Sequence, residues 1–80
     1  MSRTDIINFV KKYGNVGSTQ IEYYIDYPNM IDGDWAQVVY WEDERDLAVY
    51  LVDDIGNGEF INFDDYSHKE EIEQWINSLK

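Results

Sequence analysis

The fold is decided by residues 35 to 52, which read Trp35-Ala-Gln-Val-Val-Tyr-Trp-Glu42, then Asp43-Glu-Arg-Asp46, then Leu47-Ala-Val-Tyr-Leu-Val52. The first and last of these segments are rich in β-branched and aromatic residues, which favour strands. The polar segment between them is short enough for a tight turn. The stretch therefore predicts an antiparallel hairpin with its turn at Asp43–Asp46.

The register of this hairpin divides its side chains between two faces, because successive strand residues point to opposite sides of a sheet. Pairing Asp43 with Asp46 places Tyr40 opposite Val49. Face one then consists of Ala36, Val38, Tyr40, Leu47, Val49 and Leu51. Face two consists of Trp35, Gln37, Val39, Trp41, Ala48, Tyr50 and Val52.

On the N-terminal side of the hairpin, we expect a helix from residue 5 to 13 followed by a strand. Thr4 is the expected N-cap, and Gly14 the expected end of the helix. After a turn at residues 15–18, residues 19–27 alternate in the manner of a strand, with Glu22, Tyr24 and Asp26 on one side. Pro28 ends this strand.

On the C-terminal side, residues 53–58 contain Gly-Asn-Gly, which predicts a turn, and residues 59–63 form a last short strand. Ser67-His-Lys-Glu70 resembles a capping box. The apolar residues after it are spaced for one helical face; they are Ile72, Trp75, Ile76 and Leu79. The sequence therefore predicts a second helix that begins near Ser67.

The predicted order is helix, four strands, helix, a single α+β domain over residues 1–80 (αββββα). Short connections between consecutive strands favour an antiparallel meander. Helices on one face of the sheet would leave Trp35, Trp41, Tyr50 and Val39 near solvent. A helix on each face would instead make these side chains core.

Composition limits the functions that this chain can have. It has a net charge of −11 and no cysteine, and 44% of its 80 residues are hydrophobic, which is too many for a disordered acidic tail. Neither thiolate chemistry nor a cysteine-rich zinc site is possible. Phosphate backbones and anionic membranes would repel it. With no signal peptide or apolar run of about 20 residues, we expect a cytoplasmic protein that binds another protein.

The negative charge is concentrated in the predicted sheet and its loops. Residues 13–68 hold 13 acids and one base, a net charge of −12, whereas the flanking segments hold four acids and five bases, a net charge of +1. Alternate turns of a meander meet at the same end. We therefore expect residues 42–46 and 64–65 at one end, and Asp32, Asp34, Asp53 and Asp54 at the other. Such clusters speed association with a basic partner, although acidity also serves solubility alone.

Catalysis, metal binding and cofactors find little support in the residues. His68 is the only histidine, and no triad can be assembled around it. With 17 acids, a pair of carboxylates arises by chance, and an 80-residue chain offers little cleft for a sugar. Residues 53–64 match a calcium loop poorly, because Ile55 stands where an oxygen ligand is needed. We therefore expect a non-enzymatic protein with no metal and no cofactor.

Size, acidity and the order helix–meander–helix resemble the small phage-encoded inhibitors of bacterial defence, the anti-CRISPR and anti-restriction proteins. The closing stretch from Asp64 to Leu79, Asp-Asp-Tyr-Ser-His-Lys-Glu-Glu-Ile-Glu-Gln-Trp-Ile-Asn-Ser-Leu, is similar in style to such proteins. The resemblance implies a DNA mimic in the cytoplasm of a bacterial host. It would block the nucleic-acid site of a defence nuclease or complex.

The residues expected to bind this partner are acids of the turns and aromatic side chains of face two: Glu42, Asp43, Glu44, Asp46, Asp53, Asp54, Trp35, Trp41 and Tyr50. The expected partner is a basic, nucleic-acid-binding protein, and the chain itself would be a monomer or small homo-oligomer. Two alternatives remain open. One is an immunity or antitoxin protein that neutralises a basic toxin nuclease, and the other is a small structural subunit that associates with itself.

Overall fold

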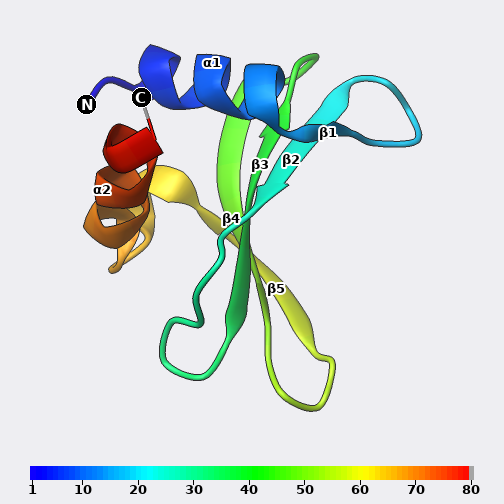
Figure 1. Ribbon diagram of the computed structural model, residues 1–80. Helices are drawn as coiled ribbons and strands as arrows, with labels where there is room; N and C mark the ends of the chain where they lie inside the picture. Colours follow the sequence, from blue (N-terminus) through cyan, green and yellow to red (C-terminus); the bar gives the residue numbers. More distant parts are fainter. Residues whose placement is uncertain (80) are drawn as a thin grey trace.

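The computed structural model describes residues 1–79, an antiparallel sheet with two helices on one side (Figure 1). The elements are α1 (Arg3–Tyr13), β1 (Asn15–Val16), β2 (Glu22–Asp26), β3 (Trp35–Trp41), β4 (Asp46–Val52), β5 (Gly58–Asn62), a 3-10 turn η1 (Phe63–Asp65) and α2 (Lys69–Leu79). The strands lie in the order of the chain, β1-β2-β3-β4-β5. The predicted α+β class and meander are confirmed.

The prediction of four strands was wrong by one, because β1 is a fifth. Asn15 pairs with Tyr24 and Val16 with Tyr23, where we expected only a turn. Two residues are too few to show an alternating pattern. Gly14 makes this strand possible, since a Cβ there would lie 2.5 Å from the carbonyl oxygens of Tyr24 and Val10. Only glycine lets the chain leave α1 so close to β2.

Helix α1 begins slightly earlier than predicted. Ser2, not Thr4, is the N-cap: its hydroxyl accepts a hydrogen bond from the Asp5 N–H at 3.2 Å. The Asp5 carboxylate accepts one in return from the Ser2 N–H, which completes a capping box. Lys11 and Lys12 occupy the last turn, where the helix dipole favours positive charge.

The central hairpin keeps its predicted faces but not its predicted register. Tyr40 lies opposite Leu47, and Trp41 opposite Asp46, so the loop is Glu42–Arg45. Arg45 has a φ of 55°, which closes this longer turn before β4 begins. The shift is by two residues, and strand side chains repeat every two residues, so no side chain changes face.

The hydrophobic core lies between face one and the two helices. Phe9 of α1 and Trp75 of α2 meet edge to face, with ring centroids 5.8 Å apart, and Tyr27 contacts Trp75 at 5.3 Å. Face one is buried except for Leu51, which is half-buried. The fully enclosed side chains come from every layer: Val10, Val38, Leu47, Val49, Phe63, Ile72 and Ile76.

The β2–β3 connection is anchored to this core. Ile31 is buried and bridges Asp34 across a two-residue turn of Asp32 and Gly33. Both turn residues have positive φ, 52° and 86°, as the tightest hairpin turns require. This turn holds Asp32 against His68, whose Nε2 lies 2.7 Å from the Asp32 carboxylate. The Nδ1 of His68 lies 3.2 Å from Glu71 of α2.

Truncation of Ile76 tests the position of the core. Ile76→Ala should lower the free energy of unfolding by about 2–5 kcal/mol, because a fully buried side chain is removed and a cavity is left. Leu79→Ala, in the same helix, is the matched control. Leu79 is 54% exposed, so its truncation should cost about 0.5 kcal/mol or less. Equal losses in urea denaturation would show that α2 does not bury this face.

The His68 contacts should make stability depend on pH. The Glu71 hydrogen bond, together with Asp32, raises the pKa of His68 above 6.5. A group whose pKa rises on folding stabilises the fold while protonated. This contribution is therefore fully present below pH 6.5 and is lost as the pH rises through the folded pKa. The difference in unfolding free energy between wild type and His68→Gln should shrink over that range. An NMR titration of His68 with its midpoint at or below 6.5 would contradict this assignment.

Candidate functional site

Face two of the sheet is left open, because both helices pack against face one (Figure 1). Trp35 is 62% exposed, and Trp41 and Tyr50 are half-buried, so all three predicted aromatic anchors reach the surface. Val39, expected near solvent, is instead buried. It sits in the middle of β3, flanked across the sheet by Tyr24 and Ala48.

Strand pairing arranges face two in rows that run across the sheet. One row holds Glu22, Trp41 and Asp46, from β2, β3 and β4. Here the Trp41 indole N–H donates to the Glu22 carboxylate at 2.9 Å. This bond fixes the angle of the ring and holds a carboxylate beside it.

A second row, four residues earlier on β3, extends to the edge of the sheet. It consists of Asp26, Gln37, Tyr50 and Phe60. The Gln37 amide donates to the Asp26 carboxylate at 2.7 Å. In both rows, therefore, a carboxylate of β2 accepts a hydrogen bond from a side chain of β3.

Phe60 is a surface residue that the sequence reasoning missed. Its ring lies 4.4 Å from that of Tyr50 and 5.3 Å from that of Trp41, and 55% of the residue is exposed. The signal was available, since alternation in β5 places Phe60 on the face opposite to Ile61. Gly58 makes room for this cluster, because a Cβ there would overlap the Tyr50 hydroxyl and ring.

The first group of predicted acids lies together around the β3–β4 loop, but not all of these acids are free. Glu42 forms an ion pair with Lys11 of α1 at 3.1 Å, and this hydrogen bond raises the pKa of Lys11. Asp43 accepts a hydrogen bond from the Glu44 N–H at 3.0 Å. Asp46 starts β4 on face two, directly opposite Trp41.

The second group, Asp53 and Asp54, lies at the other end of β4. Asp53 accepts hydrogen bonds from the backbone N–H groups of Asn57 at 2.8 Å and Ile55 at 3.0 Å, and these bonds lower its pKa. Its carboxylate thus fixes the turn, whereas Asp54 is exposed. Asp53 follows Asp46 by seven residues, which is about 23 Å at roughly 3.3 Å per residue.

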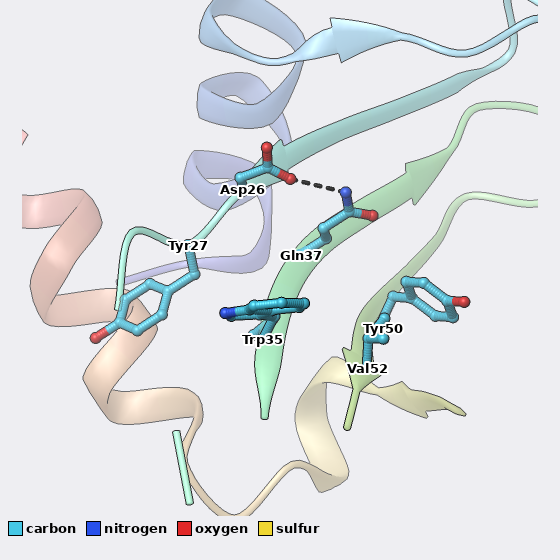
Figure 2. Close-up of a pocket in the computed structure, with 7 residues that line it drawn as sticks. Asp26, Tyr27, Trp35, Gln37, Tyr50 and Val52 are labelled. Atoms are coloured by element: carbon cyan, nitrogen blue, oxygen red, sulfur yellow. Dashed lines mark hydrogen bonds between the residues drawn. The ribbon is translucent and has the colours of Figure 1, made fainter. Parts of the chain in front are cut away.

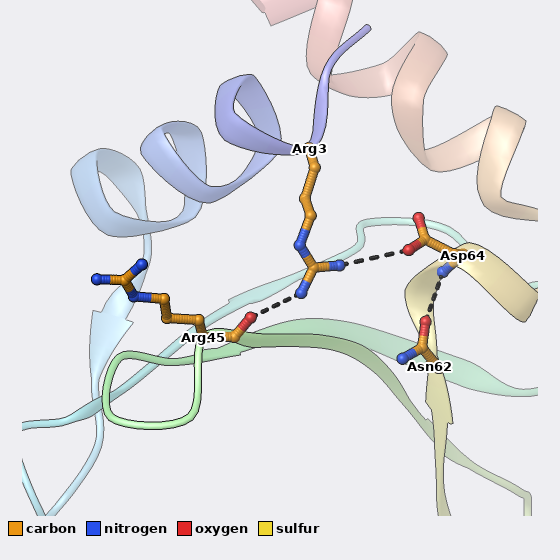
Figure 3. A network of polar contacts seen from close by, with 4 residues as sticks. All are labelled: Arg3, Arg45, Asn62 and Asp64. Atoms are coloured by element: carbon orange, nitrogen blue, oxygen red, sulfur yellow. Dashed lines mark hydrogen bonds and ion pairs between the residues drawn. The ribbon is translucent and has the colours of Figure 1, made fainter.

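The predicted meeting of acidic turns is correct for Asp64 and not for Asp65. Arg3 joins Asp64 to the hairpin loop, since its guanidinium lies 3.5 Å from the Asp64 carboxylate and donates to the Arg45 carbonyl at 2.7 Å (Figure 3). Asp65 instead borders a pocket shared with Asp32 and Asp34. Asp64 and Asp65 are adjacent in the chain, but the chain turns in η1, so their side chains lie in different surroundings.

Face two carries negative charge without compensation from its own strands. The strands β2 to β5 contain no lysine, arginine or histidine. The ion pairs of Lys11 and Arg3 with acids both originate in α1, on the helix side of the sheet. Face two is therefore an aromatic surface bordered by carboxylates that lack basic neighbours in the strands.

Within residues 1–79, no three His, Cys, Asp or Glu side chains are placed to hold a metal ion. His68 lies at the start of α2 and pairs with two carboxylates. In the same part of the chain, neither helix has the length and hydropathy to cross a bilayer. Comparison with protein-family models, curated proteins and solved structures gave no match.

Fluorescence quenching can test the character of face two. In Trp41→Phe/Trp75→Phe, Trp35 is the only tryptophan, and its emission can be excited selectively over that of the tyrosines. Neutral acrylamide and cationic caesium should quench it efficiently, because its indole is exposed. Anionic iodide should quench it several-fold less, since nearby carboxylates repel it. At about 1 M salt, where the Debye length is about 3 Å, this difference should vanish. Equal quenching by iodide and caesium at low salt would contradict an anionic surface.

Proposed function

We propose that this protein binds a basic, nucleic-acid-binding protein through face two and competes with nucleic acid for its site. The observation that carries this proposal is the open sheet face, where aromatic rings and carboxylates lie together without a base on any of its four long strands. Bare nucleic acid and anionic membranes are repelled by such a surface, whereas a basic groove is attracted to it.

The mechanism is competition for cationic side chains. Carboxylates form charge-assisted hydrogen bonds with arginine and lysine in the manner of phosphate oxygens. The exposed rings of Trp35 and Phe60 add apolar contact, and tryptophan is enriched among the residues that dominate binding energy. The carboxylates speed encounter, and the rings slow dissociation.

The spacing of the acids supports mimicry of a nucleic-acid strand. The two acidic turns lie about 23 Å apart along β4. Phosphates of one strand repeat about every 3.4 Å along a duplex, so this length corresponds to roughly seven nucleotides. On β2, Asp26 lies between these ends, in the row of Tyr50, and Glu22 lies level with Asp46. An inhibitor of a host defence nuclease or complex, anti-CRISPR or anti-restriction in type, would present charge over such a length.

Self-association through face two is the second candidate function. Trp35 and Phe60 are both more than half exposed, and β5 is an edge strand. The two candidates respond to salt in opposite directions. Salt should weaken the complex of a charged inhibitor with its basic partner, because it screens their attraction. Salt should strengthen a complex of two acidic copies, because it screens their repulsion.

Competition and charge removal test the proposal together. The tagged protein, incubated at low salt with bacterial lysate, should recover a nucleic-acid-binding protein, and excess duplex DNA or RNA should displace it. Asp46→Asn/Asp54→Asn removes two charges from the sheet ends, changing the net charge from −11 to −9. It should weaken this binding about tenfold or more, because each lost charged hydrogen bond costs about 1.5–3 kcal/mol.

Asp65→Asn/Glu70→Gln is the matched control, since it also gives a net charge of −9 but alters η1 and α2. It should bind as wild type does. Equal loss in both variants would mean that total charge, and not face two, drives binding. Recovery that competitor leaves unchanged would exclude mimicry, and an oligomer strengthened by salt would favour the second candidate.

A further inference from the structure

We propose that a pocket on face two binds the guanidinium group of an arginine side chain. The pocket has a volume of about 360 Å³ and is lined by Asp26, Tyr27, Trp35, Gln37, Tyr50 and Val52, together with Ala36 beneath them. This assignment rests on the proposed function, since it names the side chain by which the basic partner is recognised.

The walls of the pocket are aromatic. Figure 2 shows the Trp35 indole between Tyr27 on one side and Val52 and Tyr50 on the other. Trp35 and Val52 are directly paired across β3 and β4, so the register of the central hairpin places these two side chains next to each other in the pocket. A cation over the face of a tryptophan or tyrosine is stabilised by about 0.5–2 kcal/mol, more where water is excluded. Arginine in addition stacks its planar group on such rings.

The polar side of the pocket offers acceptors and a negative charge. The Gln37 Nε2 donates to Oδ1 of Asp26 at 2.7 Å, and this bond orients both side chains (Figure 2). The donor of Gln37 is thereby directed at Asp26, and its carbonyl oxygen points away from Asp26 in the same view. The Asp26 carboxylate and the Gln37 carbonyl oxygen are both acceptors, and they suit a guanidinium, which has five donors in one plane and no acceptor.

The surroundings exclude the other common occupants. An anion would meet the Asp26 carboxylate, with no basic residue in any of the strands that line the pocket. A purely apolar ligand would leave that carboxylate desolvated without a partner, which is costly. Lysine carries the right charge, but its compact ammonium cannot stack on the rings. The apolar side chain of Val52 and the ring of Tyr50 accommodate the methylene stem of arginine.

The direct test is an NMR titration of the ¹⁵N-labelled protein with the peptide acetyl-Gly-Arg-Gly-amide. The Trp35 indole and Gln37 amide signals should shift and saturate, while the backbone amide of Leu47, buried at the far end of the hairpin, should not move. The matched peptide with citrulline in place of arginine has nearly the same shape and no charge, so it should bind at least about tenfold more weakly. The lysine peptide should fall between them.

Two single variants give the chemical control. Asp26→Asn keeps an oxygen acceptor for Gln37 but removes the charge, and it should weaken arginine-peptide binding at least about fivefold. Glu70→Gln removes the same charge on α2, outside the pocket, and should leave that affinity within about twofold of wild type. Shifts that fail to saturate, equal binding of the citrulline peptide, or equal effects of the two variants would each overturn the proposal.

The experiment separates this inference from the proposed function. If the peptide fails to bind but Asp46→Asn/Asp54→Asn still abolishes recovery of a nucleic-acid-binding protein, face two functions without an arginine pocket. If the arginine peptide binds as expected and competitor nucleic acid never displaces a partner, the pocket is correct and the mimicry is wrong.

Discussion

The structure depends on one-sided burial of the sheet. Two short helices, each of 11 residues, bury their apolar stripes against face one and against each other through Phe9 and Trp75. Helices of this length are marginal alone and gain most of their stability from such packing. Because both helices pack on face one, neither of them covers face two. The open face is thus a direct consequence of how the core is made.

The same arrangement decides where negative charge is tolerated. Self-repulsion among acids at the turns opposes folding. Helix α1 offsets part of it, since Lys11 reaches Glu42 and Arg3 reaches Asp64. Asp53 is stabilised differently, because its carboxylate accepts hydrogen bonds from backbone N–H groups of its own turn. Acids of the turns therefore contribute to the fold, whereas Glu44, Asp46 and Asp54 are the exposed charges of the predicted set that no such contact occupies among those described. This distinction is why the latter are better candidates for binding than Glu42 or Asp53.

Face two is ordered in spite of being open. The acids Glu22 and Asp26 hold Trp41 and Gln37 by hydrogen bonds, and Tyr50 and Phe60 pack on each other. Side chains fixed in this way lose less conformational entropy on binding than free ones do. A surface whose rings and carboxylates are already positioned is suited to recognising a rigid, basic groove.

The sequence by itself determined the class of fold, both helices and the two faces of the central hairpin, because apolar periodicity is a local property that survives errors at the ends of elements. The hairpin shows this clearly: Tyr40 pairs with Leu47 and not Val49, yet every side chain kept its face, since a shift of two residues preserves alternation.

What only the tertiary structure decided is non-local. Strand β1 exists because Gly14 lets the chain approach Tyr24, and its two residues carry no pattern of their own. The pairing of Glu42 with Lys11, the cluster around Phe60 and the pocket beside Trp35 depend on distances between segments far apart in the chain. Trp35 is exposed because both helices pack on face one. Alternation along a strand predicts which residues share a face of the sheet, but it does not predict which face the helices cover.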